Sequence, residues 1–163
     1  MNRLLDGQTA VVTGATAGIG KAIAKTFAEQ GAFVVAIGTN SERGDAVAAE
    51  LQSLPGSAGA LFMKVDVADF QAVEQAVKAI LEKRRHVDIL VNNAGITRDQ
   101  LLMKMSEEDW DLVQNVNLKG VFFGIQAATK VMMKAKYGKI VNISSVAGLV
   151  GSAGQAVGRA GRA

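Results

Sequence analysis

The chain has 163 residues, 49% of them hydrophobic, and 18 lysines and arginines against 15 acidic residues give it a net charge of +3. This length and composition predict a single globular domain and argue against disorder. The basic residues lie among acidic ones with no aromatic residues between them, so we expect no nucleic-acid partner.

Short apolar, β-branched runs alternate with amphipathic segments, a pattern typical of alternating strands and helices. The predicted strands are Thr9–Thr13, Phe33–Ile37, Leu61–Val65, Ile89–Val91 and Lys139–Ile143. The predicted helices are Gly20–Gln30, Glu42–Ser53, Phe70–Lys83, and a long one that a capping box at Ser106–Asp109 opens and that runs towards Lys136.

Strands that are apolar throughout and separated by helices predict a parallel sheet with both faces covered. Right-handed crossovers make such a sheet doubly wound, so we expect an α/β domain of Rossmann type over residues 1–150. Residues 151–163 are nearly all Gly, Ala, Ser or Arg and show neither strand nor helix periodicity. We expect this tail to be disordered or aberrant.

The sequence contains no cysteine, which excludes disulfides and thiolate metal sites. The first residues, Met1–Asp6, are too short and too polar for a signal peptide. No apolar run reaches the ~18 residues that a membrane span needs. We therefore expect a soluble cytoplasmic protein without a membrane partner.

The first strand runs into a glycine-rich turn, Thr13–Gly20. Gly14, Gly18 and Gly20 would let the chain turn tightly and let backbone N–H groups approach a pyrophosphate at a helix N-terminus. The spacing is a variant of G-x-G-x-x-G, and such a turn also serves plain packing of a helix on a strand. Its position after the first strand favours dinucleotide binding.

The end of the second strand, Ile37–Ser41, has no acidic residue before Glu42. An acid there would bind the adenosine ribose of NAD and repel a 2′-phosphate. The segment therefore favours NADP(H), with Thr39 as a polar contact and with Arg43 and Lys21 as charge partners. Alternatively, the polar residues of this segment only cap the next helix.

Thr13–Gly20 together with Asn92–Gly95 resembles the short-chain dehydrogenase/reductase family. A further run, Gly95–Asp99 with Leu101–Glu108 and Trp110, is similar to the 3-oxoacyl-[acyl-carrier-protein] reductases of fatty acid synthesis within that family. The resemblance covers nearly the whole chain. It implies NADPH-dependent reduction of a 3-oxoacyl group on acyl carrier protein by a homo-oligomer, a tetramer in the family.

The resemblance also implies roles for individual residues. It places the dinucleotide against Thr13, Gly14, Thr16, Gly18, Ile19, Gly20, Thr39, Asp66, Val67, Asn93, Ala94 and Gly95. For catalysis it implies that Asn117 holds a proton-relay water and that Ser145 hydrogen-bonds the substrate carbonyl. It further implies docking of the acidic carrier protein at Lys136, with Lys139 nearby, although lysines at a helix end also serve only as solvated charges.

Two features depart from the family pattern. The family often has a basic residue before Gly18, and Ala17 in this chain removes that 2′-phosphate contact. The family's proton-donating tyrosine and the lysine that activates it would fall at Gly158 and Arg162. Glycine has no proton to donate, and arginine presents a planar fork in place of a compact ammonium. We therefore expect turnover by this chain to equal background.

We interpret the chain as truncated before the catalytic tyrosine and lysine and as lacking the family's C-terminal part. The resemblance then implies a five-stranded sheet in the order 3-2-1-4-5, whose fifth strand is an exposed edge. Another short-chain reductase with a different ketone substrate, or a non-catalytic dinucleotide-binding protein, are the alternatives. We expect no metal site, and we expect His86, the only histidine, to be a solvated surface residue.

Overall fold

A computed structural model describes residues 3–150 and 154–161. Its strands are β1 (Thr9–Thr13), β2 (Phe33–Gly38), β3 (Ala60–Lys64), β4 (Ile89–Asn92) and β5 (Lys139–Asn142). Its helices are α1 (Gly18–Glu29), α2 (Ser41–Ser53), α3 (Phe70–Arg84), α4 (Glu107–Gln114), α5 (Gly120–Ala135) and α6 (Ala156–Ala160). Three shorter helical turns are η1 (Leu102–Lys104), η2 (Asn115–Lys119) and η3 (Val146–Gly148).

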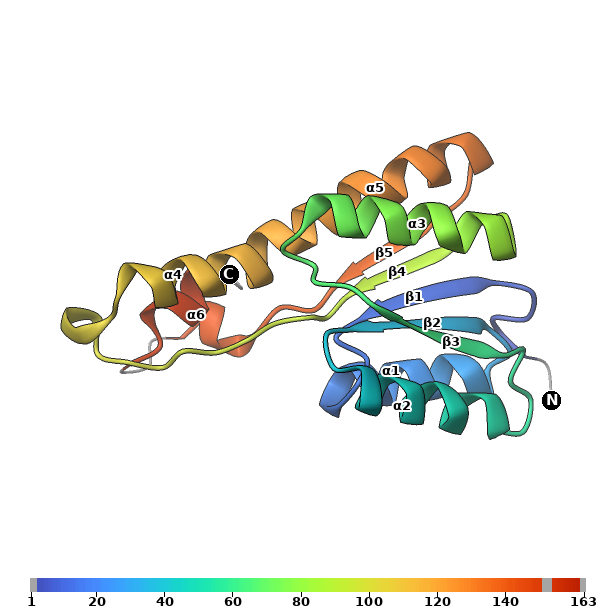
Figure 1. Cartoon of the computed structure of the whole chain (residues 1–163), viewed down its shortest axis with the longest axis horizontal. Helices are drawn as coiled ribbons and strands as arrows, with labels where there is room; N and C mark the ends of the chain where they lie inside the picture. Colours follow the sequence, from blue (N-terminus) through green and yellow to red (C-terminus); the bar gives the residue numbers. More distant parts are fainter. Residues whose placement is uncertain (1–2, 151–153, 162–163) are drawn as a thin grey trace.

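The strands pair in parallel in the order β3-β2-β1-β4-β5. Helices α1 and α2 cover one face of the sheet, and α3 and α5 cover the other (Figure 1). Both the predicted fold class and the predicted strand order are therefore confirmed.

The sheet separates two apolar cores, because alternate residues of each strand point to opposite faces. In β1, Ala10 and Val12 join the core under α1 and α2, whereas Val11 joins the core under α3 and α5. All five residues of β1 are buried. This explains why the strand shows a continuous apolar run in the sequence and no alternation with polar residues.

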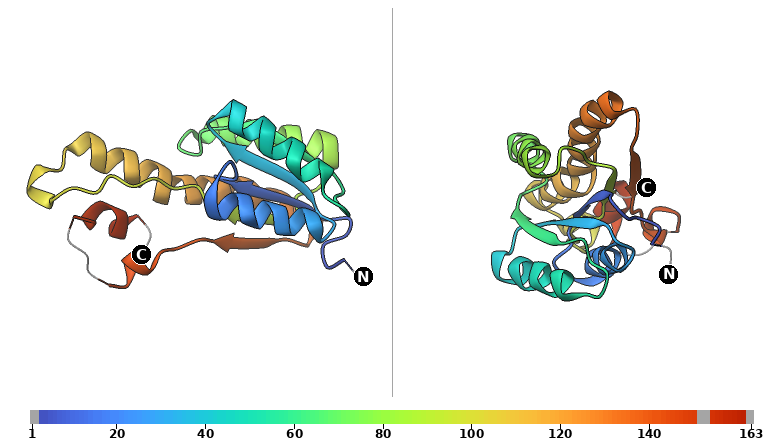
Figure 2. Two further views of the ribbon diagram at one scale, coloured as in Figure 1. Left: turned by 90° about the horizontal axis from the view of Figure 1, so that it is seen from below. Right: turned by 90° about the vertical axis from the view of Figure 1, so that its right-hand side faces the viewer.

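The strand β5 lies at one edge of the sheet, and its residues other than Ile140 are exposed (Figure 2). Val141 in particular is 44% exposed. The exposed fifth strand that the sequence predicts is therefore present. None of the helices within residues 3–150 and 154–161 is both long enough and apolar enough to cross a membrane.

The predicted long helix is not a single regular α-helix. Ser106 caps its first turn, with Oγ accepting a hydrogen bond from the backbone N of Asp109 at 3.1 Å. The π-helical turn η2 then joins α4 to α5. A π turn inserts one extra residue and shifts the side chains after it around the helix axis. It buries Asn117, which is only 4% exposed.

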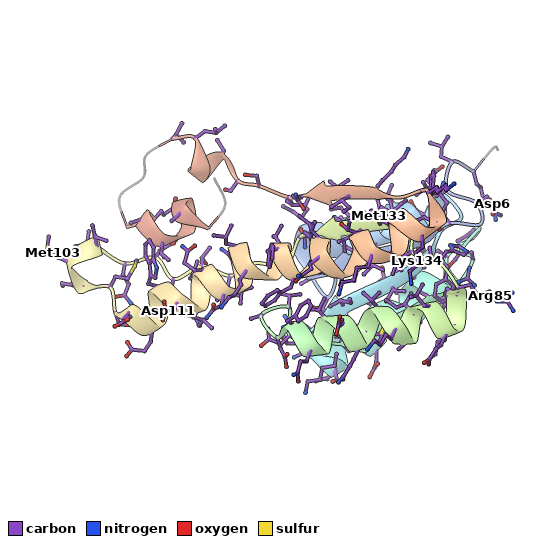
Figure 3. The ribbon with its side chains drawn as sticks, turned by 90° about the horizontal axis from the view of Figure 1, so that it is seen from above. Asp6, Arg85, Met103, Asp111, Met133 and Lys134 are labelled. Atoms are coloured by element: carbon purple, nitrogen blue, oxygen red, sulfur yellow. The ribbon has the colours of Figure 1, made fainter. Side chains whose placement is uncertain are left out.

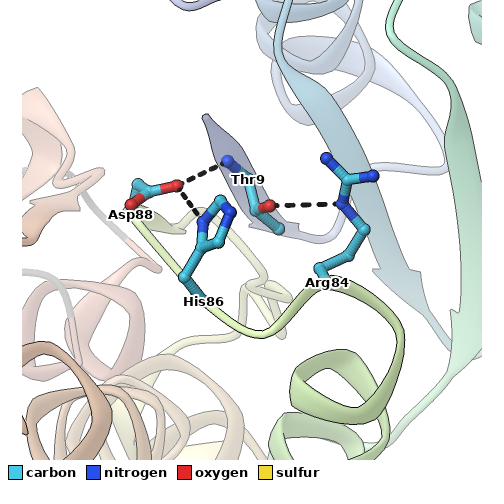
Figure 4. Close-up of polar contacts among 4 residues, drawn as sticks. All are labelled: Thr9, Arg84, His86 and Asp88. Carbon is cyan, nitrogen blue, oxygen red and sulfur yellow. Dashed lines mark hydrogen bonds and ion pairs between the residues drawn. The ribbon is translucent and has the colours of Figure 1, made fainter. Parts of the chain in front are cut away.

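Asp88 ties the amino ends of β1 and β4 together (Figure 4). Its Oδ2 accepts a hydrogen bond from the backbone N of Thr9 at 2.7 Å and lies 2.6 Å from His86 Nδ1. On the far side of Thr9, Arg84 Nε lies 3.5 Å from Thr9 Oγ1. The His86 side chain is 38% exposed, so it lies at the surface as expected, and a spacing of two residues also brings its ring beside the Asp88 carboxylate.

Within the predicted tail 151–163 the structure describes residues 154–161 and gives them more order than the sequence indicates. The backbone N of Gln100 donates to the carbonyl of Gly154 at 2.9 Å, and Gln114 Nε2 donates to the carbonyl of Val157 at 3.2 Å. Val157 is fully buried, and α6 packs against α4. The expectation of an irregular tail thus differs from the structure at α6, where one buried valine among small residues gives no periodic signal.

Candidate functional site

A pocket of about 340 Å³ lies at the carboxyl ends of the strands. It is lined by Gly14, Thr16, Ile37, Gly38, Thr39, Val65, Asp66, Val67, Ala94, Gly95, Ile96, Arg98, Leu112 and Val116. Open parallel sheets bind ligands at this end, and small-molecule pockets have volumes of roughly 300–1,000 Å³. The pocket therefore has the place and the size of a ligand site.

The pocket collects part of the predicted cofactor set. The predicted residues that line it are Gly14, Thr16, Thr39, Asp66, Val67, Ala94 and Gly95. The predicted residues outside its lining are Thr13, Gly18, Ile19, Gly20 and Asn93. These five lie in or beside the turn between β1 and α1, which contributes Gly14 and Thr16 to the pocket lining.

The turn between β1 and α1 needs glycine at specific positions. Gly14 has a φ of 65°, and a Cβ there would lie 2.8 Å from Ala94 Cα. A Cβ on Gly20 would lie 2.3 Å from the carbonyl oxygen of Gly14. These contacts let the backbone of the turn pass close to α1 and β4. The N-cap of α1 is Ala17, whose side chain cannot accept a hydrogen bond from the first turn of this helix. Such a helix start suits an anion.

Thr13 and Asn93 lock the turn to the end of β4. Thr13 Oγ1 accepts hydrogen bonds from the backbone N of Asn93 and of Ala94, both at 3.0 Å. In return, Asn93 Nδ2 donates to the carbonyl of Thr13 at 3.0 Å and to that of Gly14 at 3.3 Å. Both side chains therefore hold the site together through internal bonds, and their direct contact with a cofactor stays a prediction.

The end of β2 carries polar groups without a carboxylate. Asn40 caps α2, with Oδ1 accepting from the backbone N of Arg43 at 2.8 Å. Asn40 therefore caps the helix, as the alternative interpretation of the sequence expects, while Gly38 and Thr39 of the same segment line the pocket. Lys21 Nζ lies 2.7 Å from Glu50 Oε2, and this hydrogen bond lowers the pKa of the Glu50 carboxyl. Of the two predicted charge partners, Lys21 is thus already engaged by an acid.

Asp66 follows β3 and turns the chain towards α3. Its Oδ1 accepts a hydrogen bond from the backbone N of Ala68 at 2.9 Å, and Asp66 lines the pocket. Val67 is 8% exposed and contacts the start of α5, where a Cβ on Gly120 would lie 2.8 Å from Val67 Cγ2. Both residues line the pocket, together with Gly14 of the glycine-rich turn.

Asn117 fixes the loop that follows β4. Its Oδ1 accepts from the backbone N of Ile96 at 2.8 Å, and its Nδ2 donates to the carbonyl of Ile96 at 2.9 Å. Ile96 lines the pocket. The predicted catalytic asparagine thus acts on the pocket wall through the backbone of Ile96.

Comparison with known proteins identifies the family. A family model described as short chain dehydrogenase matches residues 8–162. The chain belongs to the short-chain dehydrogenase family. Members of this family use a nicotinamide dinucleotide, which agrees with a pocket beside a glycine-rich turn.

Several short-chain dehydrogenases are close relatives. The 3-oxoacyl-[acyl-carrier-protein] reductase FabG of Thermotoga maritima is 45% identical over 151 residues, which are 93% of this chain and 61% of that protein. The reductase of the same name from Chlamydia trachomatis serovar D is 48% identical over 155 residues, 95% of this chain and 62% of that protein. The chain thus spans less than two thirds of these relatives.

A solved structure agrees with this assignment. A crystal structure from Sinorhizobium meliloti 1021, described as that of a candidate short-chain alcohol dehydrogenase, aligns with a TM-score of 0.93 at 34% identity. The alignment covers 99% of this chain and 64% of that one.

Of the remaining positions of the short-chain dehydrogenase pattern, the structure describes Ser145 and Gly158. Ser145 follows β5, and its carbonyl accepts a hydrogen bond from the backbone N of Gly148 at 2.9 Å. Gly158 lies in α6, and a Cβ built on it meets nothing within 4 Å. Arg162 lies outside the described residues. The structure therefore brings Gly158 to the same end of the fold as Asn117, with open space where a side chain would project.

Sequence reasoning assigned no individual site role to seven residues of the pocket lining, namely Ile37, Gly38, Val65, Ile96, Arg98, Leu112 and Val116. The first three belong to strand ends that the sequence predicts, at Ile37–Ser41 and Leu61–Val65. Ile96 and Arg98 stand in the run that carried the family resemblance, but nothing in their residue types signals a pocket. Leu112 and Val116 are one helical turn apart, a spacing that also describes an ordinary packing face. The described residues hold no group of three or more His, Cys, Asp or Glu side chains arranged to bind a metal ion.

Proposed function

We propose that this chain binds NADPH and is related in function to cytoplasmic reductases of 3-oxoacyl groups carried by acyl carrier protein, while the 163-residue chain itself lacks the proton donor for that reaction. The observation that carries the proposal is the pocket at the carboxyl ends of the strands, bounded by the glycine turn at Gly14 and by an acid-free β2 end at Gly38 and Thr39. The names of the relatives support the substrate class. When bound, NADPH would supply the hydride for the C3 carbonyl.

The residues of this chain divide the work of binding. The backbone around Gly14 and Gly18, with the uncapped start of α1, would hold the pyrophosphate. Thr39 and the first turn of α2, with Arg43, would meet the 2′-phosphate. Asp66 and Val67 would face the adenine. Because Asn117 fixes the backbone of Ile96, it would keep the pocket wall in the geometry that the nicotinamide half requires.

Proton transfer is the step for which this chain lacks a side chain. Ser145 would hydrogen-bond the substrate carbonyl, but Gly158 offers no proton donor where the family resemblance implies a tyrosine. Reduction of the carbonyl needs a proton on oxygen as well as hydride on carbon. We therefore propose binding of NADPH with turnover at background for the 163-residue chain.

Acyl carrier protein is the proposed partner, with Lys136 and Lys139 as its contact. Lys136 ends α5 and Lys139 begins β5, so both lie at the amino ends of the strands, opposite the pocket. A carrier protein held by these lysines would serve the pocket of a neighbouring subunit. The proposed docking site therefore goes together with a homo-oligomer, a tetramer by analogy with the family.

A non-catalytic dinucleotide-binding role is the second candidate, and Gly158 is the observation that favours it. In this role the bound NADPH would not reduce a substrate. The other alternative, a short-chain reductase, would reduce a ketone other than a 3-oxoacyl thioester.

Two measurements on the 163-residue chain test the proposal. Titration followed by nicotinamide fluorescence should show NADPH binding more tightly than NADH. Absorbance at the nicotinamide band, with an acetoacetyl thioester as substrate, should show no oxidation of NADPH above background. Failure to bind either dinucleotide would overturn the proposal, and oxidation of NADPH would overturn the assigned lack of a proton donor.

A further inference from the structure

Thr16 and Gly38 meet at the rim of the pocket. Gly38 is the last residue of β2, Thr16 lies in the turn between β1 and α1, and both line the pocket. A Cβ built on Gly38 would lie 2.6 Å from Thr16 Cγ2, closer than real Cβ atoms approach another heavy atom. The methyl group of Thr16 thus occupies the space that a side chain at position 38 would need.

This contact, and not the backbone, is what selects glycine at position 38. Gly38 is absent from the glycines with positive φ, so an L-residue could adopt its backbone conformation. The same Cβ would lie 3.5 Å from Thr16 Oγ1 and 3.7 Å from Phe62 Cε2, both ordinary contacts. Only the methyl group excludes the side chain, and a β-branched residue has restricted χ1 freedom with which to move it.

The end of β2 is also where a carboxylate would favour NADH, by binding the adenosine ribose and repelling a 2′-phosphate. We propose that Thr16 and Gly38 form a coupled pair that sets the cofactor preference. The methyl of Thr16 excludes a side chain, and with it a carboxylate, from position 38, which keeps the end of β2 open to the 2′-phosphate of NADPH. This inference rests on the proposed function, since it concerns the cofactor of the same pocket.

The first test measures the coupling without any cofactor. Urea unfolding is followed for the wild-type chain, Gly38→Ala, Thr16→Ser and the double variant. Thr16→Ser removes only the methyl and keeps the hydroxyl. We expect Gly38→Ala to lower the unfolding midpoint in the wild-type background and to leave it nearly unchanged in the Thr16→Ser background. Equal losses in the two backgrounds would overturn the coupling.

The second test measures the preference by fluorescence titration with NADPH and NADH. We expect Gly38→Asp alone to weaken the binding of NADPH at least about tenfold. It should not strengthen the binding of NADH, because the new side chain clashes with the methyl group of Thr16 and disturbs the rim of the pocket. Thr16→Ser with Gly38→Asp should bind NADH about tenfold more tightly than Gly38→Asp alone. Equal NADH affinity of the single and double variants would overturn the inference.

The two tests separate the inference from the proposed function. If the wild-type chain binds neither dinucleotide, the proposed function fails, while the unfolding experiment still decides whether Thr16 and Gly38 are coupled. If the wild-type chain binds NADPH and the unfolding effects are additive, the proposed function stands and the coupled pair is refuted.

Discussion

The side chain of Asn117 satisfies both backbone groups of Ile96, accepting from its N at 2.8 Å and donating to its carbonyl oxygen at 2.9 Å. Asn117 reaches this position because the π-helical turn η2 interrupts the long helix there. An amide side chain carries an acceptor oxygen and a donor nitrogen side by side, so it can bind the N–H and the carbonyl of one residue at the same time. A helical irregularity and an amide together therefore fix the wall of the pocket.

This relationship predicts a large effect for a nearly isosteric substitution. Asn117→Asp places a carboxylate oxygen opposite the carbonyl of Ile96, where the amide N–H was, in a site that is only 4% exposed. We expect a loss of about 2–4 kcal/mol in the free energy of unfolding, measured by urea denaturation.

The matched control for that variant is Asn115→Asp in the same turn. Asn115 Oδ1 lies 3.4 Å from Lys119 Nζ, so a carboxylate there gains an opposite charge. We expect its stability to stay within about 0.5 kcal/mol of wild type. Similar losses for both variants would show that the turn tolerates no acid anywhere and that the Ile96 bonds are not the cause.

The fold could be predicted from the sequence because local and global patterns agree. The continuous apolar runs gave the parallel sheet, and the glycine turn after Thr13 gave the binding end of that sheet. The site was predicted less completely. The contact between Thr16 and Gly38, and the bonds of Asn117 to Ile96, join segments far apart in the chain, and no periodicity encodes them. The short α6 was not predicted, because the packing of the buried Val157 stabilises it and its sequence has no helical pattern.

The two predicted phosphate partners should behave differently. Lys21 is held by Glu50 at 2.7 Å, whereas Arg43 lies in the first turn of α2, next to the polar end of β2. We expect Arg43→Ala to weaken the binding of NADPH about tenfold and to leave the affinity for NADH unchanged, because only NADPH carries the 2′-phosphate. Lys21→Ala should change neither affinity by more than about twofold. Fluorescence titration of both variants with both dinucleotides measures this, and a selective NADPH loss in Lys21→Ala would reverse the assignment.

Lys136 offers a test of backbone strain at the proposed carrier-docking end. It ends α5 with a φ of 53°, in the left-handed region that favours glycine. We expect Lys136→Gly to raise the free energy of unfolding by up to about 1 kcal/mol.

Lys134→Gly is the charge-matched control. Lys134 lies in the last turn of α5, at the same end of the molecule as Met133 and Arg85 and opposite Met103 and Asp111 (Figure 3). We expect Lys134→Gly to lower the free energy of unfolding by up to about 1 kcal/mol, because glycine is unfavourable inside a helix. Thermal unfolding measures the stability of both variants. If Lys136→Gly also lowers the stability, the lysine side chain itself stabilises the helix end.

Gly158 allows the proposed lack of a proton donor to be tested directly. A Cβ at this position meets nothing within 4 Å, so the backbone environment leaves room for a side chain to begin there. We expect Gly158→Tyr to fold and to oxidise NADPH with an acetoacetyl thioester at least about tenfold faster than Gly158→Phe, since a positioned general acid contributes roughly 10²–10⁴-fold. The phenylalanine variant has the same ring without the hydroxyl, so it controls for packing. Equal rates for the two variants, with NADPH binding intact, would show that a hydroxyl at position 158 is not what the site lacks.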